Sequence, residues 1–508
     1  MFGKLDKNYF ILLIVFAFTQ AVYLFSEYIL TNGQFGVPLD DVWIHFRFAE
    51  NFSQGHFFHY NIGQPTPGTT SPLWVIILSI PFLISSKLIL PFALTISSFC
   101  FIATIILVYE FCIRHGFKNT NALFSALITL LCGRLLWSSL SGMEITLFCL
   151  LSIWIFHRQL SEYQSQKVFA STGLLLGLAV NTRPEAYLLA VIYCFVTFIL
   201  LRKVLNENIG KIFISMICFL ILALPYPIFC YTLTGKFLPN TFEGQGGGFN
   251  YLPNTQFLVE TGKLFFKENF AILFLWILSL GFFIKHLAKK SFDRKYLFVY
   301  LWIFLLPLVS SFVAPNWRHH GRYLIPLIPF INIAAVILLQ ELTDKIKNRQ
   351  QMIRKVFLAV ILLASINSTI IFSQALGWNV QNINDQQVKI AKWLNENLSN
   401  EKSFAVNDIG AITFFTKKNI VDMEGLVTPE IFSFQKMGDE ENSKNLFALL
   451  KKNDVNYIVI YPHWFKYIME NYSGALEQVY SAKLERNTIC GAPEMFVYKI
   501  NWRNAKLQ

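Results

Sequence analysis

The sequence predicts a polytopic α-helical membrane protein of about eleven spans that ends in a small α/β domain outside the membrane. Three observations predict this architecture. The 508 residues have a mean hydropathy of +0.46, and 54% of them are hydrophobic, which is too apolar for a water-soluble globule. Apolar runs of about 18 or more residues recur between residues 9 and 374. From about residue 378 to the end, the composition becomes that of a soluble domain.

The excess of basic residues indicates membrane topology and argues against nucleic-acid binding. The formal net charge is +12, and most of the excess lies in short loops between apolar runs, where positive residues mark the cytoplasmic side. Most of the cysteines lie in or beside apolar runs, and no CxxC or Cys/His ligand spacing occurs. We therefore expect no structural disulfide and no thiolate zinc site.

The first apolar run, residues 9–30, predicts a retained membrane span. It is longer than the apolar core of a signal peptide and carries no small-residue cleavage site. Lys4 and Lys7 precede it, so the N-terminus is expected in the cytoplasm. Residues 31–87 then form a long first outer loop.

The apolar runs 73–84 and 88–113 set the orientation of everything that follows. If both crossed the membrane, the basic loop 114–118 would lie outside and every later basic loop would be inverted. The run 73–84 is too short to cross about 30 Å of hydrocarbon, so we interpret it as a re-entrant or interfacial helix. The cytoplasmic loops are then residues 114–118, 158–167, 202–211, 285–295 and 345–355.

The chain is expected to divide into a transmembrane domain, residues 1–377, and an external α/β domain, residues 378–508. The last span, about 356–374, exits outward and carries the tail with it. In the tail, helical apolar spacing at 385–398 and 446–452 alternates with apolar strand-like runs. The expected strands are residues 403–406, 420–421, 457–460, 479–484 and 495–500.

Two adjacent carboxylates, Asp40 and Asp41, follow the first span. Acids beside a bilayer are costly and are functional candidates by default, and a positioned carboxylate suits general-base catalysis. The structural alternative is helix capping, because Asp is a favoured N-cap and the sequence VWIHFRFAENF follows directly. Adjacent side chains on a helix diverge by about 100°. One acid, preferably Asp41, is therefore expected as the base, while the other orients it, holds a cation or caps the helix.

The other unusual polar groups also fall on the predicted outer side. Glu144 and Glu185 are candidates for a sugar or cation site, with a first-turn helix acid and a local ion pair with Arg183 as the alternatives. Arginines bind phosphate bidentately, so their presence here predicts a lipid-linked phosphate, with interfacial snorkelling as the alternative. The candidate phosphate ligands are Arg318, Arg322, Arg183 and His320, and further candidates for substrate contact are Lys236, Asn240 and His59.

An ordered set of short strings resembles a known family of membrane enzymes. The strings are DDVWIHFRFAENFSQGHFFHYN, GTTSPLW, SGMEITLF, TRPEA, LPNTF, GRYLIPLIPF, NDIGAITFF and IVDMEGLV. Together with a first span, an Asp-Asp pair in a long outer loop and many further spans, they resemble the GT-C superfamily of glycosyltransferases. The strings are similar to one branch of it, which includes the mycobacterial terminal arabinofuranosyltransferases, and the resemblance extends over nearly the whole chain.

The resemblance implies a catalytic role for one acid and a phosphate-binding role for the arginines. Asp40 or Asp41 would deprotonate an acceptor hydroxyl, and the lipid phosphate would leave into a basic pocket containing Arg318 and Arg322. Glu144 and Glu185 would shape the sugar site or hold a divalent cation, which is the one candidate cofactor. Either stereochemical course fits the branch.

The sequence therefore predicts a glycosyltransferase that uses a polyprenyl-phosphate sugar and modifies a cell-envelope glycan or lipid. It is expected as a multi-pass protein of a bacterial cytoplasmic membrane, in contact with membrane lipid and without a nucleic-acid partner. The alternative is a lipid or glycan transporter, for which polar groups near the bilayer midplane and internal repeats would be typical. A third reading is an inactive scaffold whose outer domain binds glycan.

Overall fold

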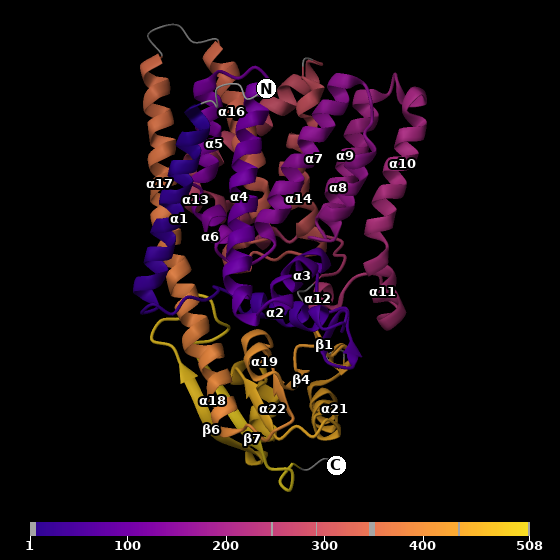
Figure 1. Cartoon of the computed structure of the whole chain (residues 1–508), viewed down its shortest axis with the longest axis vertical. Coiled ribbons are helices and arrows are strands. Elements are labelled where there is room, and N and C mark those ends of the chain that lie inside the picture. The colour runs from indigo at the N-terminus through magenta and orange to yellow at the C-terminus, as the bar shows by residue number, and fades with distance from the viewer. Residues whose placement is uncertain (1–6, 245–246, 291, 345–350, 435–436, 506–508) are drawn as a thin grey trace. The chain divides into compact units, whose positions relative to one another are not determined.

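The computed structural model describes residues 7–244, 247–290, 292–344, 351–434 and 437–505, and these form two compact units. The first unit contains residues 1–26, 94–225 and 246–374, and the second contains residues 27–93, 226–245 and 375–508. Figure 1 labels their elements along the chain. The second unit thus joins most of the predicted first outer loop to the predicted tail domain. The assignment of residues 1–377 and 378–508 as domains stays a prediction.

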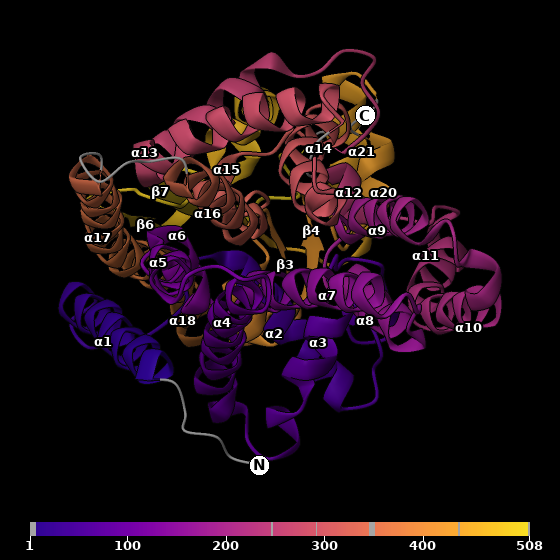
Figure 2. The same cartoon turned by 90° about the horizontal axis from the view of Figure 1, so that it is seen from above.

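The first unit is built from helices, most of them apolar. They begin with α1 (Lys7–Leu30) and α4 (Ile89–Arg114). Helix α7 packs on α8 and α9, whereas α14 packs on α9, α13 and α16, and Figure 2 shows these helices from above. The other helices are α5 (Asn119–Leu130), α6 (Gly133–Ser139), α7 (Ile145–Ser165), α8 (Ala170–Val180), α9 (Ala186–Leu201), α10 (Leu205–Ala223), α13 (Thr255–Ala288), α14 (Leu297–Val313), α15 (Arg318–Gly321), α16 (Ile328–Asp344) and α17 (Gln351–Ile383).

Among the described residues, seven helices are long and apolar enough to cross a membrane, and α5 with α6, bent by 62°, makes an eighth candidate. Three shorter apolar helices cover Pro72–Leu83, Ala170–Val180 and Ala186–Leu201. The protein is therefore a multi-pass membrane protein, whereas the total of about eleven spans and their orientation stay predictions. Residues 1–6, 291 and 345–350, which include Lys4 and parts of two predicted basic loops, lie outside the described residues.

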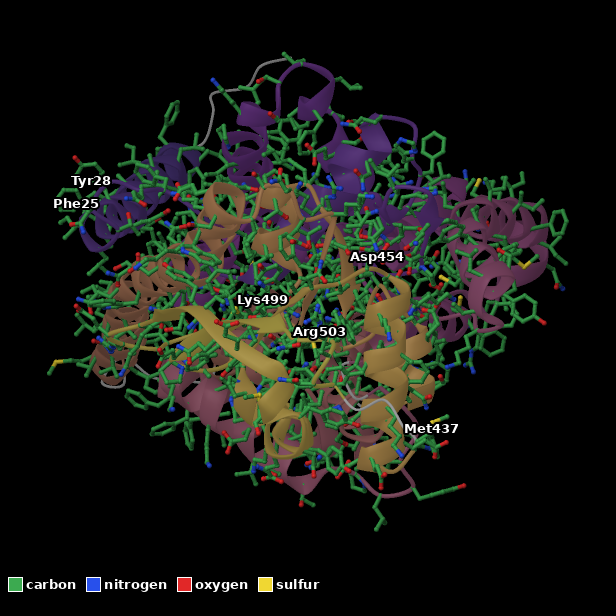
Figure 3. All side chains as sticks on the ribbon, turned by 90° about the horizontal axis from the view of Figure 1, so that it is seen from below. Phe25, Tyr28, Met437, Asp454, Lys499 and Arg503 are labelled. Atoms are coloured by element: carbon green, nitrogen blue, oxygen red, sulfur yellow. The ribbon has the colours of Figure 1, made fainter. Side chains whose placement is uncertain are left out.

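Two features of these helices are typical of a membrane environment. Phe25 and Tyr28 on α1 are 65% and 55% exposed, and their side chains project outward (Figure 3). Helices α8 and α10 approach very closely at Gly173, where a Cβ would overlap the backbone oxygen of Ser215. Small residues at such crossings allow close packing, which drives helix association in lipid.

The second unit contains a five-stranded sheet within the described part of the tail. Strand β3 (Ser403–Val406) runs parallel to β4 (Asn419–Asp422) and to β5 (Tyr457–Ile460), and β7 (Glu494–Ile500) is antiparallel to β5 and to β6 (Leu476–Lys483). The strand order is β4-β3-β5-β7-β6. Every residue of β3 and β5 is buried, as expected for continuously apolar strands in the middle of a sheet. The predicted small α/β domain is confirmed.

The predicted helix over residues 385–398 contains an irregularity. Residues Asn384–Val388 form a π-helical turn, η6, before α18 (Lys389–Asn397) begins. Single π turns inside helices occur frequently at functional sites. Here the turn carries Gln386 and Gln387, both fully buried, whose amide groups bond to the hydroxyl of Tyr461.

Residues 27–93 of the second unit contact the tail through helix packing and specific hydrogen bonds. Helix α2 (Asp40–Ser53) packs on α19 (Gly410–Thr416). Asn61, in the short hairpin of β1 (His59–Asn61) with β2 (Gln64–Pro65), exchanges two hydrogen bonds with the backbone of Ile420, at 2.8 and 3.0 Å. The same unit includes α3 (Pro72–Ser79), α11 (Pro225–Thr234), α12 (Asn240–Gly244), α20 (Glu430–Phe434), α21 (Asp439–Lys452) and α22 (Lys466–Asn471).

Candidate active site

Asp40 and Asp41 are the first two residues of α2, and neither caps that helix. The N-cap position is Leu39, in an extended conformation (φ −140°, ψ 141°), and no side-chain cap is formed. Acidic side chains in a first turn are stabilised by the helix dipole. The capping alternative for this pair is therefore not realised within α2 itself.

Asp40 instead caps a helix of the tail. Its Oδ2 accepts a hydrogen bond from Gly410 N at 2.7 Å, and its Oδ1 accepts one from Ala411 N at 2.8 Å. These are the first two residues of α19, whose N–H groups have no partner within their own helix. A Cβ on Gly410 would overlap the backbone oxygen of Asp40, so only glycine permits this approach. Both carboxylate oxygens of Asp40 are thus engaged in fixing α2 to the tail.

A third acid, Asp408, joins the pair from the turn before α19. Its Oδ2 accepts a hydrogen bond from Gln387 Nε2 at 2.9 Å and lies 3.0 Å from the Tyr461 hydroxyl. That hydroxyl has one proton, and its shorter contact, 2.6 Å, is to Gln386 Oε1. If the Tyr461 hydroxyl donates its proton to Gln386, it can only accept from Asp408. The contact between Asp408 and Tyr461 is then a hydrogen bond only when Asp408 is protonated.

The pKa values of these acids are shifted in the direction of proton uptake. Burial, then the negative charge of Asp408, raises the pKa of Asp40 to about 8, although the two backbone N–H groups act to lower it. Burial, with a further contribution from Asp41, also raises the pKa of Asp408. Because like charges in a poorly hydrated region cannot all ionise easily, the cluster of Asp40, Asp41 and Asp408 is expected to hold at least one proton near neutral pH.

The loop after β4 adds two further acids to this region. Asp422 accepts hydrogen bonds from Glu424 N at 2.9 Å and Val427 N at 2.8 Å, which fixes the turn. Burial raises the pKa of Asp422 to about 6. Burial, followed by the charges of Asp422 and Asp408, raises the pKa of Glu424 to about 7. Glu424 is therefore close enough to Asp408 to respond to its charge.

Several strings of the sequence meet in this unit through backbone contacts. Asn240 N donates to Pro67 O at 3.0 Å, and Gly68 packs on Val427, where a Cβ would lie 2.7 Å from the valine side chain. The side chain of Asn240 is buried. Lys236, by contrast, is exposed, and the His59 ring donates its Nδ1–H to Phe57 O at 3.0 Å within its own loop.

The first unit holds a second cluster, centred on Arg183. Its Nη1 lies 2.6 Å from Glu144 Oε1 and its Nη2 lies 2.8 Å from Glu185 Oε1. The side chains of Arg183 and Glu144 are each 3% exposed. The three candidates thus form a buried ion-paired triad in which two carboxylates balance the guanidinium, and the Arg183–Glu185 pair corresponds to the local ion pair given as the alternative.

Tyr323 extends this cluster to Arg322. The guanidinium groups of Arg183 and Arg322 lie 4.8 and 5.1 Å from the centre of the Tyr323 ring, and Arg322 Nη2 donates to its hydroxyl at 3.1 Å. Cations near an aromatic ring are attracted by its electron-rich faces. Arg322 is buried, whereas Arg318 is exposed.

His320 has a structural environment in the first unit. Its ring lies 5.1 Å from that of Trp137 and 5.4 Å from that of Phe372, and its backbone oxygen accepts from Arg134 Nη1 at 3.3 Å. His319, His320 and Gly321 all have positive φ (52°, 59° and 66°). This conformation is costly for histidine and, where it persists, is held by surrounding structure, often at functional sites.

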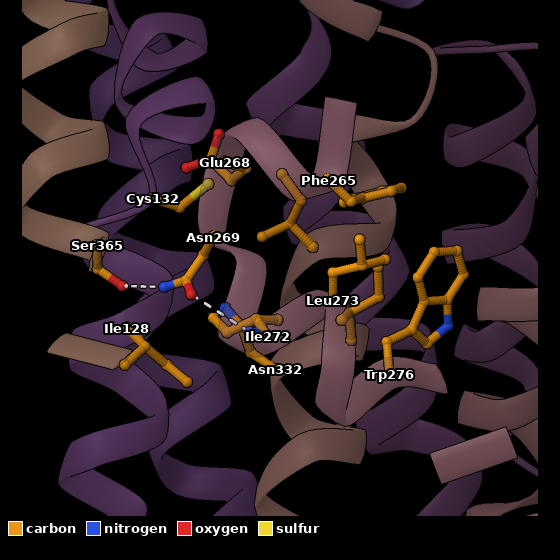
Figure 4. Close-up of a pocket in the computed structure, with 12 residues that line it drawn as sticks. Ile128, Cys132, Phe265, Glu268, Asn269, Ile272, Leu273, Trp276, Asn332 and Ser365 are labelled. Atoms are coloured by element: carbon orange, nitrogen blue, oxygen red, sulfur yellow. Dashed lines mark hydrogen bonds between the residues drawn. The ribbon is translucent and has the colours of Figure 1, made fainter. Parts of the chain in front are cut away.

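A buried ion pair between Arg134 and Glu268 was not predicted from the sequence. Arg134 Nε lies 2.9 Å from Glu268 Oε2, and the guanidinium is 4.9 Å from the centre of the Phe265 ring. Next to it is a small apolar cavity of about 20 Å³, lined in part by Cys132, Phe265 and Glu268. Figure 4 shows Asn269 bonded to Ser365 across this cavity. The cavity is too small for a sugar, and the pair is a packing feature of the helices.

Sequence reasoning also missed the partners of the Asp-Asp pair. Asp408 and Gly410 occur in NDIGAITFF, and Glu424 occurs in IVDMEGLV, strings that were quoted only for their resemblance. An acid one or two residues before a glycine, after an apolar strand, was the available signal. Among the described residues, no group of three His, Cys, Asp or Glu side chains is arranged to hold a metal ion.

Comparisons with known proteins place the fold. Residues 381–498 match a family described as a domain of unknown function, DUF8728. No curated protein matches the chain. Among solved structures, the chain is similar to ArnT from Cupriavidus metallidurans bound to undecaprenyl phosphate, with 12% identity, a TM-score of 0.60 and coverage of 97% of this chain and 98% of ArnT.

Two further solved structures are similar over most of this chain. The Archaeoglobus fulgidus oligosaccharyltransferase, tethered with an acceptor peptide, is 13% identical with a TM-score of 0.57, over 95% of this chain and 74% of that one. The mycobacterial arabinofuranosyltransferase AftD is 14% identical with a TM-score of 0.50, over 96% of this chain and 40% of that one. This protein therefore has the fold of the GT-C glycosyltransferases.

Proposed function

We propose that this protein is a membrane glycosyltransferase that moves a sugar from a polyprenyl-phosphate donor to a glycan or lipid acceptor of the cell envelope. The fold it shares with three glycosyltransferases over at least 95% of its length supports this. The capture of undecaprenyl phosphate by ArnT supports the donor class. At identities of 12–14%, however, the chemistry has to be argued from the residues of this chain.

The observation that carries the proposal is the difference between the contacts of Asp40 and those available to Asp41. Both oxygens of Asp40 bind the N-terminus of α19, so this residue positions the start of α2. Asp41 is partly exposed and follows directly, and its side chain diverges from that of Asp40 by about 100°. Asp41 is therefore our candidate base, and Asp40 is a positioning residue.

In the proposed reaction, the Asp41 carboxylate accepts the proton of an acceptor hydroxyl. The bond between that oxygen and C1 of the donor sugar forms as the bond from C1 to the phosphate oxygen breaks, and the polyprenyl phosphate leaves with the electron pair. General-base catalysis of this kind supplies about 10² to 10⁴-fold. The raised proton affinity of the neighbouring acids suits a site that takes up and releases a proton near neutral pH.

The second cluster is proposed to receive the phosphate of the donor. Arg322 is the candidate ligand, because it is buried and Tyr323 fixes its guanidinium. Arg183 is balanced by Glu144 and Glu185, so we assign this triad to shaping the site. Both glutamates that were candidates for holding a divalent cation are paired with Arg183, so no step of the proposed reaction is assigned to a metal. We propose the outer face of a bacterial cytoplasmic membrane as the location, with the tail domain outside.

The transporter alternative has less support. A transporter would be expected to concentrate polar groups near the bilayer midplane, between repeated halves. Here Asp40, Asp41, Asp408, Asp422 and Glu424 all lie in the unit that contains the tail sheet. The sequence shows no internal repeat.

Sugar transfer by purified protein tests the proposal. Wild-type, Asp41→Asn and Asp40→Asn proteins would be incubated with a panel of undecaprenyl-phosphate sugars and envelope glycans, and the products identified by mass spectrometry. The members of this panel would be chosen by comparing the glycans and polyprenyl-phosphate lipids of cells with and without the protein. Asp41→Asn is expected to abolish transfer while the protein still inserts and binds donor. Turnover close to wild type in both variants would overturn the mechanism.

A further inference from the structure

The tail domain contains a polar cleft, separate from the acid cluster. It has a volume of about 360 Å³ and opens between the loop after β4, the N-terminal half of α21, the turn η7 (Pro462–Trp464) and α22. Its floor includes Ile431, Leu446 and Ile468 of the hydrophobic core. Its polar and aromatic lining includes Glu424, Asp439, Asn442, His463, Trp464 and Tyr467.

The aromatic side of the cleft is held in place from behind. Trp464 is 41% exposed, yet its ring lies 5.4 Å from that of Tyr461. Gly491 packs against both rings, since a Cβ there would lie 2.8 Å from Trp464 and 2.7 Å from Tyr461. The indole is thus a rigid platform with a solvent-facing side. A large exposed ring supported in this way contributes contact area at low entropic cost.

The opposite side of the cleft offers hydrogen-bonding groups. Asn442 and Ser443 lie on α21, and Glu424 lies on the loop after β4. The charged lining consists of Glu424 and Asp439 against Lys466, with no arginine. This balance disfavours a phosphate or another anion, which guanidinium groups typically bind. The polar lining equally disfavours a prenyl chain.

Glu424 and Tyr461 link the cleft to Asp408 of the acid cluster. Glu424 lines the cleft and responds to the charge of Asp408. Tyr461 supports Trp464 with its ring and contacts Asp408 with its hydroxyl, at 3.0 Å. A chain of hydroxyl-rich units that occupied the cleft would therefore extend toward the acids at the start of α2.

We propose that this cleft binds the acceptor as a saccharide chain, with one sugar ring stacked on Trp464 and its hydroxyls bonded to Asn442 and Glu424. The assignment rests on the proposed function, because it names the acceptor of that reaction as a glycan and gives it a binding site. The tail domain then selects the acceptor, and the acids at the start of α2 act on the hydroxyl that reaches them.

Binding of oligosaccharides to the full-length protein in detergent tests the cleft without requiring turnover. The probes are fluorescently labelled oligosaccharides released from bacterial envelope polysaccharides and, separately, undecaprenyl phosphate. Trp464→Ala is expected to weaken oligosaccharide binding at least about tenfold, as for a central aromatic anchor. Binding of undecaprenyl phosphate should stay unchanged. Trp464→Phe should retain most of the affinity, and Tyr251→Ala, which removes a ring that is 91% exposed outside the cleft, should retain all of it.

Three outcomes would overturn the cleft assignment. These are wild-type protein that binds none of the oligosaccharides, Trp464→Ala that binds them normally, and Trp464→Ala that loses only undecaprenyl phosphate. The transferase proposal is judged separately by Asp41→Asn, which should bind oligosaccharide like the wild type but transfer no sugar. Oligosaccharide binding that depends on Trp464 in a protein without any transfer would support the cleft and refute the transferase.

Discussion

The carboxylate of Asp40 caps the N-terminus of the helix that begins at Gly410, 370 residues further along the chain. A helix end offers N–H groups that have no partner in their own helix, and a carboxylate there is stabilised by charge-assisted hydrogen bonds and by the helix dipole. The first acid of the Asp-Asp pair is thus part of the tail's structure. Its neighbour Asp41 is placed by the same contact.

Gly410→Ala should separate α2 from the tail. The added methyl group would overlap the backbone of Asp40, and overpacking of this kind typically costs about 1–3 kcal/mol, in addition to about 1 kcal/mol for a disturbed helix cap. We expect faster proteolysis of the tail and loss of sugar transfer. Gly474→Ala is the matched control, because a Cβ there meets nothing within 4 Å. Normal transfer by Gly410→Ala would refute the positioning role.

The stability of the protein should decrease as the pH rises through neutrality. Burial and neighbouring charges raise the pKa of Asp40 from about 4 to about 8 and that of Glu424 to about 7. The folded state therefore holds protons that the unfolded state has released, and stability falls with pH in this window. Thermal unfolding in detergent at pH 5, 7 and 9 measures the trend. Asp40→Asn removes one titrating group and should flatten it; an unchanged slope in this variant would contradict the assignment to Asp40.

Glu144→Ala should destabilise the first unit far more than removal of an exposed acid. It would leave the buried Arg183 guanidinium without its 2.6 Å partner, and breaking a buried pair on one side typically costs about 3–5 kcal/mol. Glu260→Ala removes an acid from an exposed pair with Lys263 and should cost less than about 1 kcal/mol. Thermal denaturation of both variants in the same detergent gives the comparison. Equal unfolding temperatures would show that the triad does not stabilise the fold.

Arg322→Ala should weaken donor binding more than it affects folding. Truncation of a guanidinium that binds a phosphate in a desolvated site costs about 2–5 kcal/mol of affinity. This is checked by measuring the dissociation constant of undecaprenyl phosphate for the wild type, for Arg322→Ala and for Lys263→Ala, which truncates an exposed side chain. Wild-type affinity in a well-folded Arg322→Ala protein would remove Arg322 from the phosphate site.

The predicted orientation can be tested with single cysteines in a cysteine-free background. Lys118 and Lys402 are both exposed. Because basic loops face the cytoplasm, Lys118→Cys should resist a membrane-impermeant thiol reagent applied from outside, whereas Lys402→Cys should react. Labelling of Lys118→Cys from outside would invert the topology and show that the run 73–84 crosses the membrane.

Local patterns in the sequence determined the class of fold. Long apolar runs can satisfy their backbone groups in lipid only as helices, and short apolar runs between helical segments predicted the tail sheet. Strands β3 and β5 were predicted at their observed bounds. The sequence also placed Glu144, Arg183 and Glu185 on the same side of the membrane, since all three lie at predicted outer ends of spans.

Tertiary structure alone distinguishes the two adjacent acids. A pair of adjacent aspartates before a helix fits a catalytic role, an N-cap role or both. The sequence does not separate these roles, because each of them requires a carboxylate at the same position. Only the contact with Gly410 and Ala411 distinguishes Asp40 from Asp41, and it joins segments that share no local pattern. The participation of Asp408 and the cleft beside Trp464 depend on the folded tail in the same way. The periodicity of apolar residues indicates which side of a helix or strand is buried. The partner of a buried charge, in contrast, depends on packing between distant parts of the chain.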